Sequence, residues 1–224
     1  MNKLDENDVP VIAVDGPGGS GKGTITTRLA EYLGWHFLDS GALYRLTALA
    51  AIKKQVPLDD EAALGEVATN LDIRFETHEG TVKALLEGVD VTDRLRFEDT
   101  GAVASRIAAI PAVRAALSER QRRFRQPPGL VADGRDMGTV IFPDAGLKIF
   151  LTASAEIRAE RRYKQLKEKG ESVNLTRLFR EIKARDLRDQ SRSVAPLRPA
   201  EDAVIIDSTD LSIDEVFDKV VSLI

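Results

Sequence analysis

Cysteine is absent from this chain of 224 residues. The protein therefore cannot form a disulfide bond, a thiolate metal site or a cysteine nucleophile. Histidine is almost as scarce, since His36 and His78 are the only two. Two histidines exclude a multi-histidine zinc cluster and leave little material for a Ser-His-Asp hydrolase. The chemistry of this chain is therefore expected to need no imidazole.

The sequence also lacks a large excess of charge and a long hydrophobic run. Its 32 Lys and Arg against 36 Asp and Glu give a formal net charge of -4, which argues against a protein that coats nucleic acid or an anionic membrane. No run reaches the roughly 18 apolar residues of a membrane span, and the polar, acidic start MNKLDENDVP does not resemble a signal peptide. No heptad pattern predicts assembly. We expect a soluble, cytoplasmic monomer without nucleic-acid or membrane partners.

Short apolar runs alternate with helical stretches along most of the chain. Residues 9–14 (VPVIAV) precede a Gly-rich turn and a predicted helix at about 22–33, and further apolar runs lie at 130–132, 147–151 and 203–206. Such alternation predicts an α/β fold of three layers, with a parallel core sheet flanked by helices. Residues 71–91 differ, because three short segments broken at Glu79-Gly80 and Glu87-Gly88 predict a small antiparallel meander inserted into this fold.

A glycine-rich loop follows the first predicted strand and opens the first predicted helix. Its residues are Gly16, Pro17, Gly18, Gly19, Ser20, Gly21, Lys22, Gly23 and Thr24. Glycines let backbone N–H groups turn inward around a phosphate, the helix N-terminus adds positive potential, and Lys22 supplies a point charge. The alternative is a flexible turn with an exposed lysine, but the spacing and both flanks favour a P-loop that binds ATP.

One position departs from the general P-loop pattern, which places a hydroxyl directly after the lysine. Gly23 occupies that position and Thr24 follows it, so direct ligation of Mg²⁺ by the hydroxyl is not expected. The sequence G-K-G-T instead resembles the variant in adenylate kinase and its relatives, where waters and the nucleotide phosphates largely hold the metal. Thr24 and Asp133 are candidates to contact magnesium through water, although Asp133 could instead cap a helix or turn.

Three further motifs resemble those of bacterial cytidylate kinases, and the resemblance extends from Val11 onward. They are D-S-G-A-L-Y-R at residues 39–45, A-D-G-R-D-M-G-T-V-I-F-P-D-A at 132–145, and R-D-x-R-D-x-S-R at 185–192 followed by A-P-L. The meander is similar to the insertion in that family's monophosphate-binding part. The resemblance implies transfer of the γ-phosphoryl group of ATP to CMP or dCMP with Mg²⁺, giving ADP and CDP or dCDP.

The resemblance also implies a pocket for cytosine. Cytosine presents an amine donor beside two acceptors, so its pocket needs a carboxylate or hydroxyl acceptor next to a cationic donor. Asp136, Ser105 and Arg114 match the family's base-contacting residues. From residue type alone, Asp136 could instead pair with Arg135 or Arg188, and Ser105 could bond back within a helix.

The remaining implied site residues bind phosphate or sugar. Arg45 follows Ser40, a candidate helix cap, and both are expected near the acceptor, with Asp189 on its sugar hydroxyl. The implied catalytic residues are Lys22, Arg135, Arg185 and Arg192, of which the arginines also clamp the monophosphate. The arginines near 185–192 could equally form a solvated stripe paired with Asp186 and Asp189. Arg158 and Arg161 resemble lid residues that reach ATP, or lie on a solvated helix face.

These predictions divide one kinase unit, residues 1–224, into three parts. The core covers 9–66, 109–155 and 176–224, the monophosphate-binding insertion covers 67–108, and a short helical lid covers 156–175. Two rival functions remain open. One is a kinase for another acceptor such as UMP, AMP or shikimate, because fold and phosphate loop do not choose the acceptor. The other is a nucleotide-gated interaction module without phosphoryl transfer.

Overall fold

The computed structural model describes residues 9–78, 81–168 and 170–224. The chain forms two compact units, the first made of residues 1–39 and 122–224 and the second of residues 40–121. No helix within the described ranges combines the length and the apolar character needed to cross a membrane.

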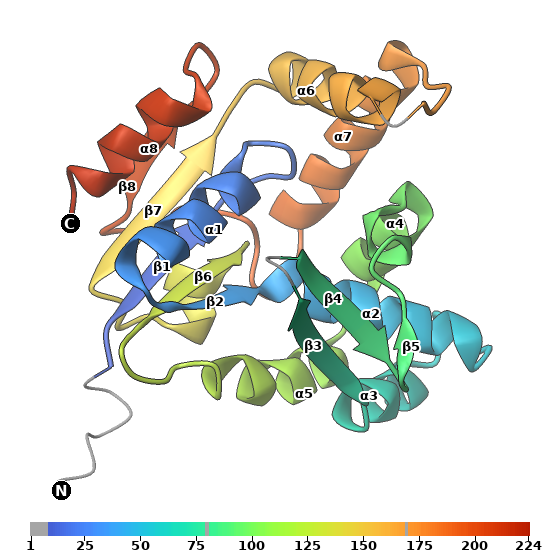
Figure 1. The fold of residues 1–224 in the computed structure, drawn as a ribbon. Coiled ribbons are helices and arrows are strands. Elements are labelled where there is room, and N and C mark those ends of the chain that lie inside the picture. The colour runs from blue at the N-terminus through green and yellow to red at the C-terminus, as the bar shows by residue number, and fades with distance from the viewer. Residues whose placement is uncertain (1–8, 79–80, 169) are drawn as a thin grey trace, which may run out of the picture. The chain divides into compact units, whose positions relative to one another are not determined.

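A five-stranded parallel sheet forms the centre of the first unit (Figure 1). Its strands are β1 (Val11–Asp15), β2 (His36–Asp39), β6 (Leu130–Gly134), β7 (Leu147–Thr152) and β8 (Val204–Asp207), in the order β2-β6-β1-β7-β8. Every pairing is parallel. All residues of β1 and β6 are buried, as expected for the nearly continuous apolar runs of central parallel strands. The predicted parallel core sheet is confirmed.

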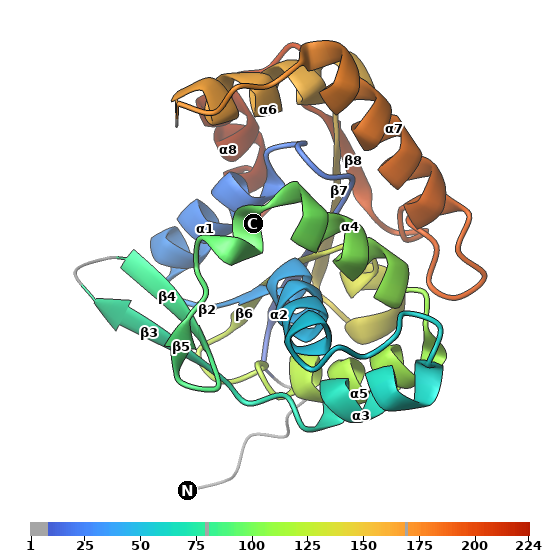
Figure 2. The ribbon, with the colours of Figure 1, turned by 90° about the vertical axis from the view of Figure 1, so that its right-hand side faces the viewer.

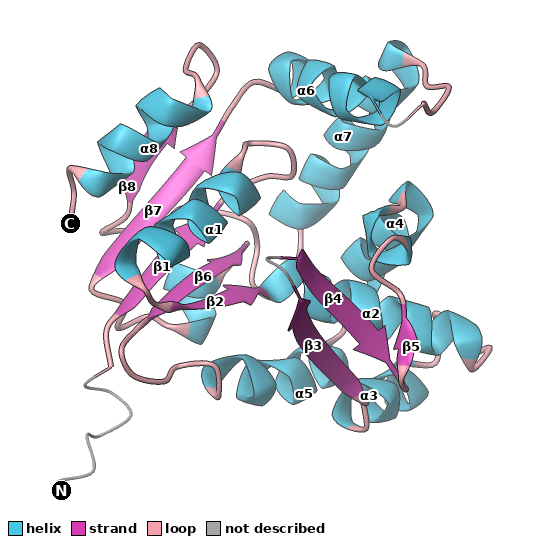
Figure 3. Ribbon diagram, viewed as in Figure 1, coloured by secondary structure: helices cyan, strands magenta, loops and turns pink. Residues whose placement is uncertain are grey.

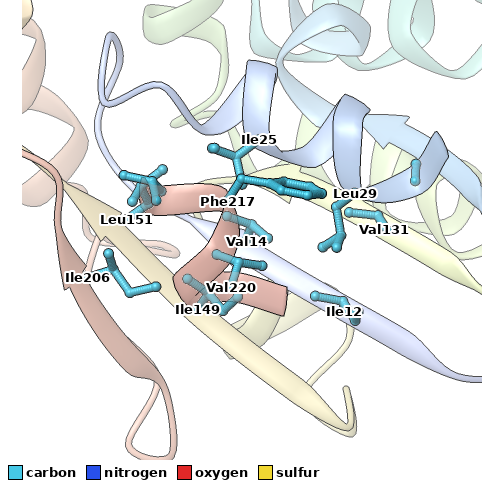
Figure 4. Close-up of a cluster of buried hydrophobic side chains, with 12 residues drawn as sticks. Ile12, Val14, Ile25, Leu29, Val131, Ile149, Leu151, Ile206, Phe217 and Val220 are labelled. Carbon is cyan, nitrogen blue, oxygen red and sulfur yellow. The ribbon is translucent and has the colours of Figure 1, made fainter. Parts of the chain in front are cut away.

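Helices flank this sheet, as the secondary-structure colouring of Figure 3 makes plain. α1 (Lys22–Leu33) and α8 (Ile213–Val221) pack over the strands, and the short π-helix η3 (Met137–Ile141) contacts β1 and β6. The helices α6 (Ala155–Glu168) and α7 (Leu175–Gln190) pack against each other. Figure 4 shows the hydrophobic cluster in which Ile25 and Leu29 of α1 and Phe217 of α8 pack over the strands. This packing fixes the start of α1, and therefore the loop before it, against the ends of the strands.

The second unit contains a bundle of helices and the small antiparallel sheet (Figure 2). Its elements are α2 (Ser40–Lys53), α3 (Glu61–Thr69), β3 (Ile73–His78), β4 (Thr81–Leu86), β5 (Val89–Asp90), η2 (Arg94–Arg96), α4 (Glu98–Ile107) and α5 (Pro111–Arg122). The strand order β3-β4-β5 confirms the predicted meander. Glu87 and Gly88 both have positive φ, as a two-residue type I′ hairpin requires, whereas the predicted break at Glu79-Gly80 lies outside the described residues.

The second unit is larger than the insertion predicted at residues 67–108. It also includes α2, α3 and α5, because these helices pack closely with one another. A Cβ atom added to Gly65 of α3 would lie 2.8 Å from the Cβ of Ala112 in α5, so the two backbones approach closely there. The division into core, insertion and lid stays a prediction about which segments move.

Candidate active site

The glycine-rich loop joins β1 to α1, in the context that its sequence predicts. Gly16 begins the loop, and a Cβ atom at this position would lie 2.0 Å from the carbonyl oxygen of Leu151. No side chain fits there. Gly21 caps α1 with a φ of 91°, a conformation that residues with side chains rarely adopt. The loop is therefore shaped by close packing against β7 and by glycine backbone geometry.

Lys22 is buried at the start of α1, with 7% of its surface exposed. Its Nζ atom lies 3.5 Å from Oδ1 of Asp133, at the carboxyl end of β6, and 3.5 Å from the carbonyl oxygen of Pro17. The pKa of Lys22 is lowered to about 8, first by burial and then by the charge of Arg135, while the charge of Asp133 opposes the change. Burial raises the pKa of Asp133, whereas Lys22 lowers it. The exposed-lysine alternative is wrong, and Asp133 acts as an ion-pair partner.

Three arginines surround the carboxylate of Asp189, which is 1% exposed near the end of α7. Arg135 Nε donates to Oδ2 at 3.2 Å, Arg192 Nη2 donates to Oδ1, and Arg185 Nε lies 3.9 Å from Oδ2. The backbone carbonyl of Asp189 accepts a hydrogen bond from the N–H of Leu197 at 2.8 Å. The carboxylate of Asp189 thus holds guanidinium groups from three positions of the chain close together.

Two of these arginines reach the phosphate loop. A Cβ atom added to Gly18 would lie 3.5 Å from Arg135 Nη2 and 3.7 Å from Arg185 Nη1. The charges of both arginines also lower the pKa of Lys22, as expected for cations that lie near one another. Positive groups from the start of α1, from the residue after β6 and from α7 thus converge at one place. This arrangement suits the binding of phosphate groups.

Asp136 is buried in the first unit, with 4% of its surface exposed. It precedes η3, and its carbonyl oxygen accepts hydrogen bonds from the N–H groups of Val140 and Ile141 at 2.9 and 3.2 Å. Its grouping with Ser105 and Arg114, which belong to the second unit, stays a prediction.

The second unit holds the other predicted acceptor residues. Ser40 is the buried first residue of α2, and Ser105 and Arg114 are each 5% exposed. Arg114 Nη1 donates to Tyr44 Oη and to the carbonyl of Ala108, both at 3.3 Å. A guanidinium buried in this way is held in one place.

Arg45 lies one turn into α2 and points toward the start of α4. Its Nη1 donates to the carbonyl oxygen of Leu95. A Cβ atom added to Gly101 would lie 3.1 Å from Arg45 Nη2, so the guanidinium packs directly against the α4 backbone. Arg45 is thus presented next to the helix that carries Ser105.

The predicted lid arginines contact the protein itself. Arg158 is 4% exposed, and its guanidinium forms two hydrogen bonds to Asp186 of α7, at 3.1 and 2.5 Å. Its Nη1 also donates to the carbonyl of Gly18 at 3.1 Å. Arg161 donates to the carbonyl oxygen and the hydroxyl of Ser208, at 2.6 and 3.1 Å. These contacts argue against a solvated helix face, and contact with ATP stays a prediction.

Sequence reasoning missed two residues that support the site. Asp15, the last residue of β1, accepts hydrogen bonds from the backbone N–H groups that open η3. The sequence does contain a signal for Asp15, because it is an acidic residue at the end of an otherwise apolar strand. Ser208 follows β8, and its hydroxyl lies 3.1 Å from the carbonyl oxygen of Ser20 in the phosphate loop. No local pattern indicates that contact, because 188 residues separate the two.

The site has a glycine-rich loop between a parallel strand and a helix, a buried lysine at the end of that loop, and converging arginines beside it. These features define the class of the protein as a P-loop kinase. Residues 12–224 match the family model described as cytidylate kinase. Cytidylate kinases of Aeromonas salmonicida and Aeromonas hydrophila are 60% and 61% identical to the chain, over 95% and 92% of it and over 93% and 90% of their own lengths. That of Pseudomonas fluorescens is 60% identical over 95% of this chain and 94% of its own. The chain belongs to the cytidylate kinase family.

Proposed function

We propose that this chain transfers the γ-phosphoryl group of ATP to CMP or dCMP, giving ADP and CDP or dCDP. The observation that carries the proposal is the convergence of Lys22, Arg135 and Arg185 at the phosphate loop of a cytidylate kinase family member. A cluster of fixed cations beside a P-loop suits a reaction in which charge moves between two phosphates.

The phosphate loop takes the donor. The backbone N–H groups of residues 18–24, in the loop and at the start of α1, surround the phosphates of ATP, and Lys22 neutralises the outer ones. Arg158 supports this loop through the carbonyl of Gly18, and Arg161 supports it through Ser208, which approaches Ser20. In this proposal both arginines hold the ATP-binding loop in shape. Measuring ATP binding by variants substituted at Arg158 or Arg161 tests whether they also contact ATP directly.

The chemistry needs cations and alignment, and it needs no strong base. The nucleophile is an oxygen of the CMP phosphate, which is already anionic near neutral pH. Lys22, with a pKa of about 8, is mostly protonated at pH 7, and arginines keep their charge throughout. These groups offset negative charge on the phosphoryl group while it passes between the two nucleotides.

Magnesium fits this site as an ion held mainly by phosphates and water. No group of three His, Cys, Asp or Glu side chains in the described ranges could hold a metal ion alone. Asp133 offers a buried carboxylate beside the phosphate loop, and its Oδ2 would lie 3.5 Å from a Cβ added to Gly23. Asp133, with the exposed Thr24 that directly follows Gly23, would hold waters of the ion. Bound Mg²⁺ would neutralise phosphate charge and align the transferred group.

The acceptor is recognised at its base, phosphate and sugar. Asp136, Ser105 and Arg114 read the edge of cytosine, as a carboxylate, a hydroxyl and a cation can. The monophosphate is bound by arginines, with Asp189 on the sugar hydroxyl and Ser40 at the start of α2; the arginines are Arg45, Arg135, Arg185 and Arg192. Asp136 in the first unit, and Ser105 and Arg114 in the second, are each buried.

Coupled measurement of ADP release tests this proposal. The enzyme is assayed with ATP and Mg²⁺ against CMP, dCMP, UMP, AMP and GMP, with Lys22→Ala as the blank. We expect turnover with CMP and dCMP that the blank lacks. Release that depends on another acceptor would keep the kinase and overturn the cytosine pocket. No acceptor-dependent release at all would favour a nucleotide-gated binding module.

A further inference from the structure

Asp15 connects the two segments of the first unit on which the proposed chemistry depends. It is the last residue of β1, directly before the phosphate loop, and 4% of its surface is exposed. Its Oδ1 accepts the N–H of Met137 and its Oδ2 accepts the N–H of Gly138, both at 2.8 Å. These are the first two residues of η3, which follows directly after Arg135 and Asp136.

An ionised carboxylate at this buried position lowers the stability of the fold. The pKa of Asp15 is raised to about 7, mainly by burial and also by the negative charges of Asp136 and Asp133, although both backbone hydrogen bonds oppose the rise. No ion pair in the described part of the chain includes Asp15. A neutral residue would avoid this cost. The benefit of the carboxylate lies in its geometry, since two oxygens can accept two neighbouring N–H groups at once.

Arg135 and Asp136 are placed by this contact. Arg135 is held at its side chain by Asp189, at 3.2 Å, and its Nη2 would lie 3.5 Å from a Cβ at Gly18 in the phosphate loop. Its backbone position, like that of Asp136, is set by the turn that enters η3. Asp15 fixes that turn to the end of the strand from which the phosphate loop begins.

We propose that Asp15 is a positioning residue: it sets the places of Arg135 and Asp136 relative to the phosphate loop through the amides of Met137 and Gly138. This inference rests on the roles proposed above for Arg135 and Asp136. The alternative is that Asp15 only caps η3 and stabilises the fold. The two differ in what a substitution does to turnover and to base selectivity while the protein is still folded.

Asp15→Asn is the variant that tests this proposal, because it keeps the size of the side chain. Its amide would present a donor to one of the two N–H groups, so the turn must shift. We expect kcat with CMP to fall about tenfold or more, since small misplacements of reacting groups cost up to about a hundredfold. The ratio of kcat/KM for CMP to that for UMP should also fall, while the Kd for ATP changes less than about threefold.

Several controls keep the result interpretable. Thermal unfolding establishes that Asp15→Asn is folded at the assay temperature. If it is not, Asp15→Glu, which keeps both acceptors but is one methylene longer, is measured in its place with the same expectation. In a double-mutant cycle, Asp136→Asn should remove most of the effect of Asp15→Asn on base selectivity, because Asp15 acts through Asp136.

Two results would overturn the inference. One is a folded variant with a lower Tm but unchanged kcat and selectivity, which describes a structural cap alone. The other is an equal loss of ATP affinity and acceptor turnover, which describes general damage to the loop. Wild-type enzyme that fails to phosphorylate CMP would instead refute the proposed function, so the two failures are distinguishable.

Discussion

At the scale of the residue, the site depends on charged groups that are buried against their preference. Lys22 has a folded pKa of about 8, below the 10.5 of an exposed lysine, so its ionised form destabilises the fold below pH 8. Its contribution to stability therefore rises as the pH increases from about 8 to 10.5. Asp15 behaves in the opposite way, because its raised pKa makes its contribution fall as the pH rises toward about 7. Both positions reduce the stability of the fold, Lys22 to place a cation beside the phosphate loop and Asp15 to accept the two N–H groups of Met137 and Gly138.

The depressed pKa of Lys22 predicts how ATP binding depends on pH. Deprotonation removes a cation from the phosphates, so the affinity for ATP in the free enzyme should fall as the pH rises through about 8. Lys22→Arg stays charged over this range and should show no such fall, whatever its absolute affinity. Equilibrium titration with ATP between pH 7 and 9.5 makes the comparison. The same decline in both proteins would assign it to another group.

Most single residues of the site can be found in the sequence, because their motifs are local. The phosphate loop, Lys22 and the arginines of residues 185–192 all follow from short patterns. These local patterns do not predict which acidic residue pairs with which arginine. Asp186 and Asp189 have similar neighbours in sequence. Asp186 nevertheless pairs with Arg158, whereas Asp189 accepts hydrogen bonds from Arg135 and Arg192. That distinction arises from which face of α7 each side chain occupies once the helices have packed.

At the scale of the element, the pairing of α6 with α7 connects the predicted lid to the phosphate loop. Arg158 of α6 contacts Asp186 of α7 and the carbonyl of Gly18 with the same guanidinium. If the predicted lid opened, the hydrogen bonds of Arg158 would have to break, or Asp186 and the phosphate loop would have to move together with the lid. The strands and helices themselves were predicted well from apolar periodicity and turn residues, but a lid boundary at residues 156–175 concerns motion, which periodicity does not report.

The buried ion pair between α6 and α7 should be needed for stability. The Arg158 and Asp186 side chains are 5% and 17% exposed, so Asp186→Asn leaves a cation without its full partner. We expect a loss of about 3 kcal/mol in the free energy of unfolding, measured by urea denaturation. Glu181→Gln on the same helix is the matched control. Its partner Arg177 is 79% exposed, and the loss should stay within about 0.5 kcal/mol. Equal losses would show that the buried pair has no special role.

At the scale of the whole molecule, the residues divide between two compact units. The phosphate loop, Asp136 and the arginines around Asp189 belong to the first, whereas Arg45, Ser105 and Arg114 belong to the second. The sequence predicted a separate acceptor-binding part, since the meander breaks the α/β alternation. It did not predict the extent of that unit, because α2, α3 and α5 have the same helical periodicity as core helices. Which helices pack together is decided by tertiary contacts such as that of Gly65 with Ala112.

Transfer between two bound nucleotides is the central claim, and the fate of a labelled phosphoryl group tests it most directly. The enzyme is incubated with Mg²⁺, CMP and ATP labelled in its γ-phosphate, and the nucleotides are separated. The account predicts that the label appears in the β-phosphate of CDP, with little inorganic phosphate, and that Lys22→Ala abolishes this. Label released only as inorganic phosphate, or retained in ATP, would contradict it.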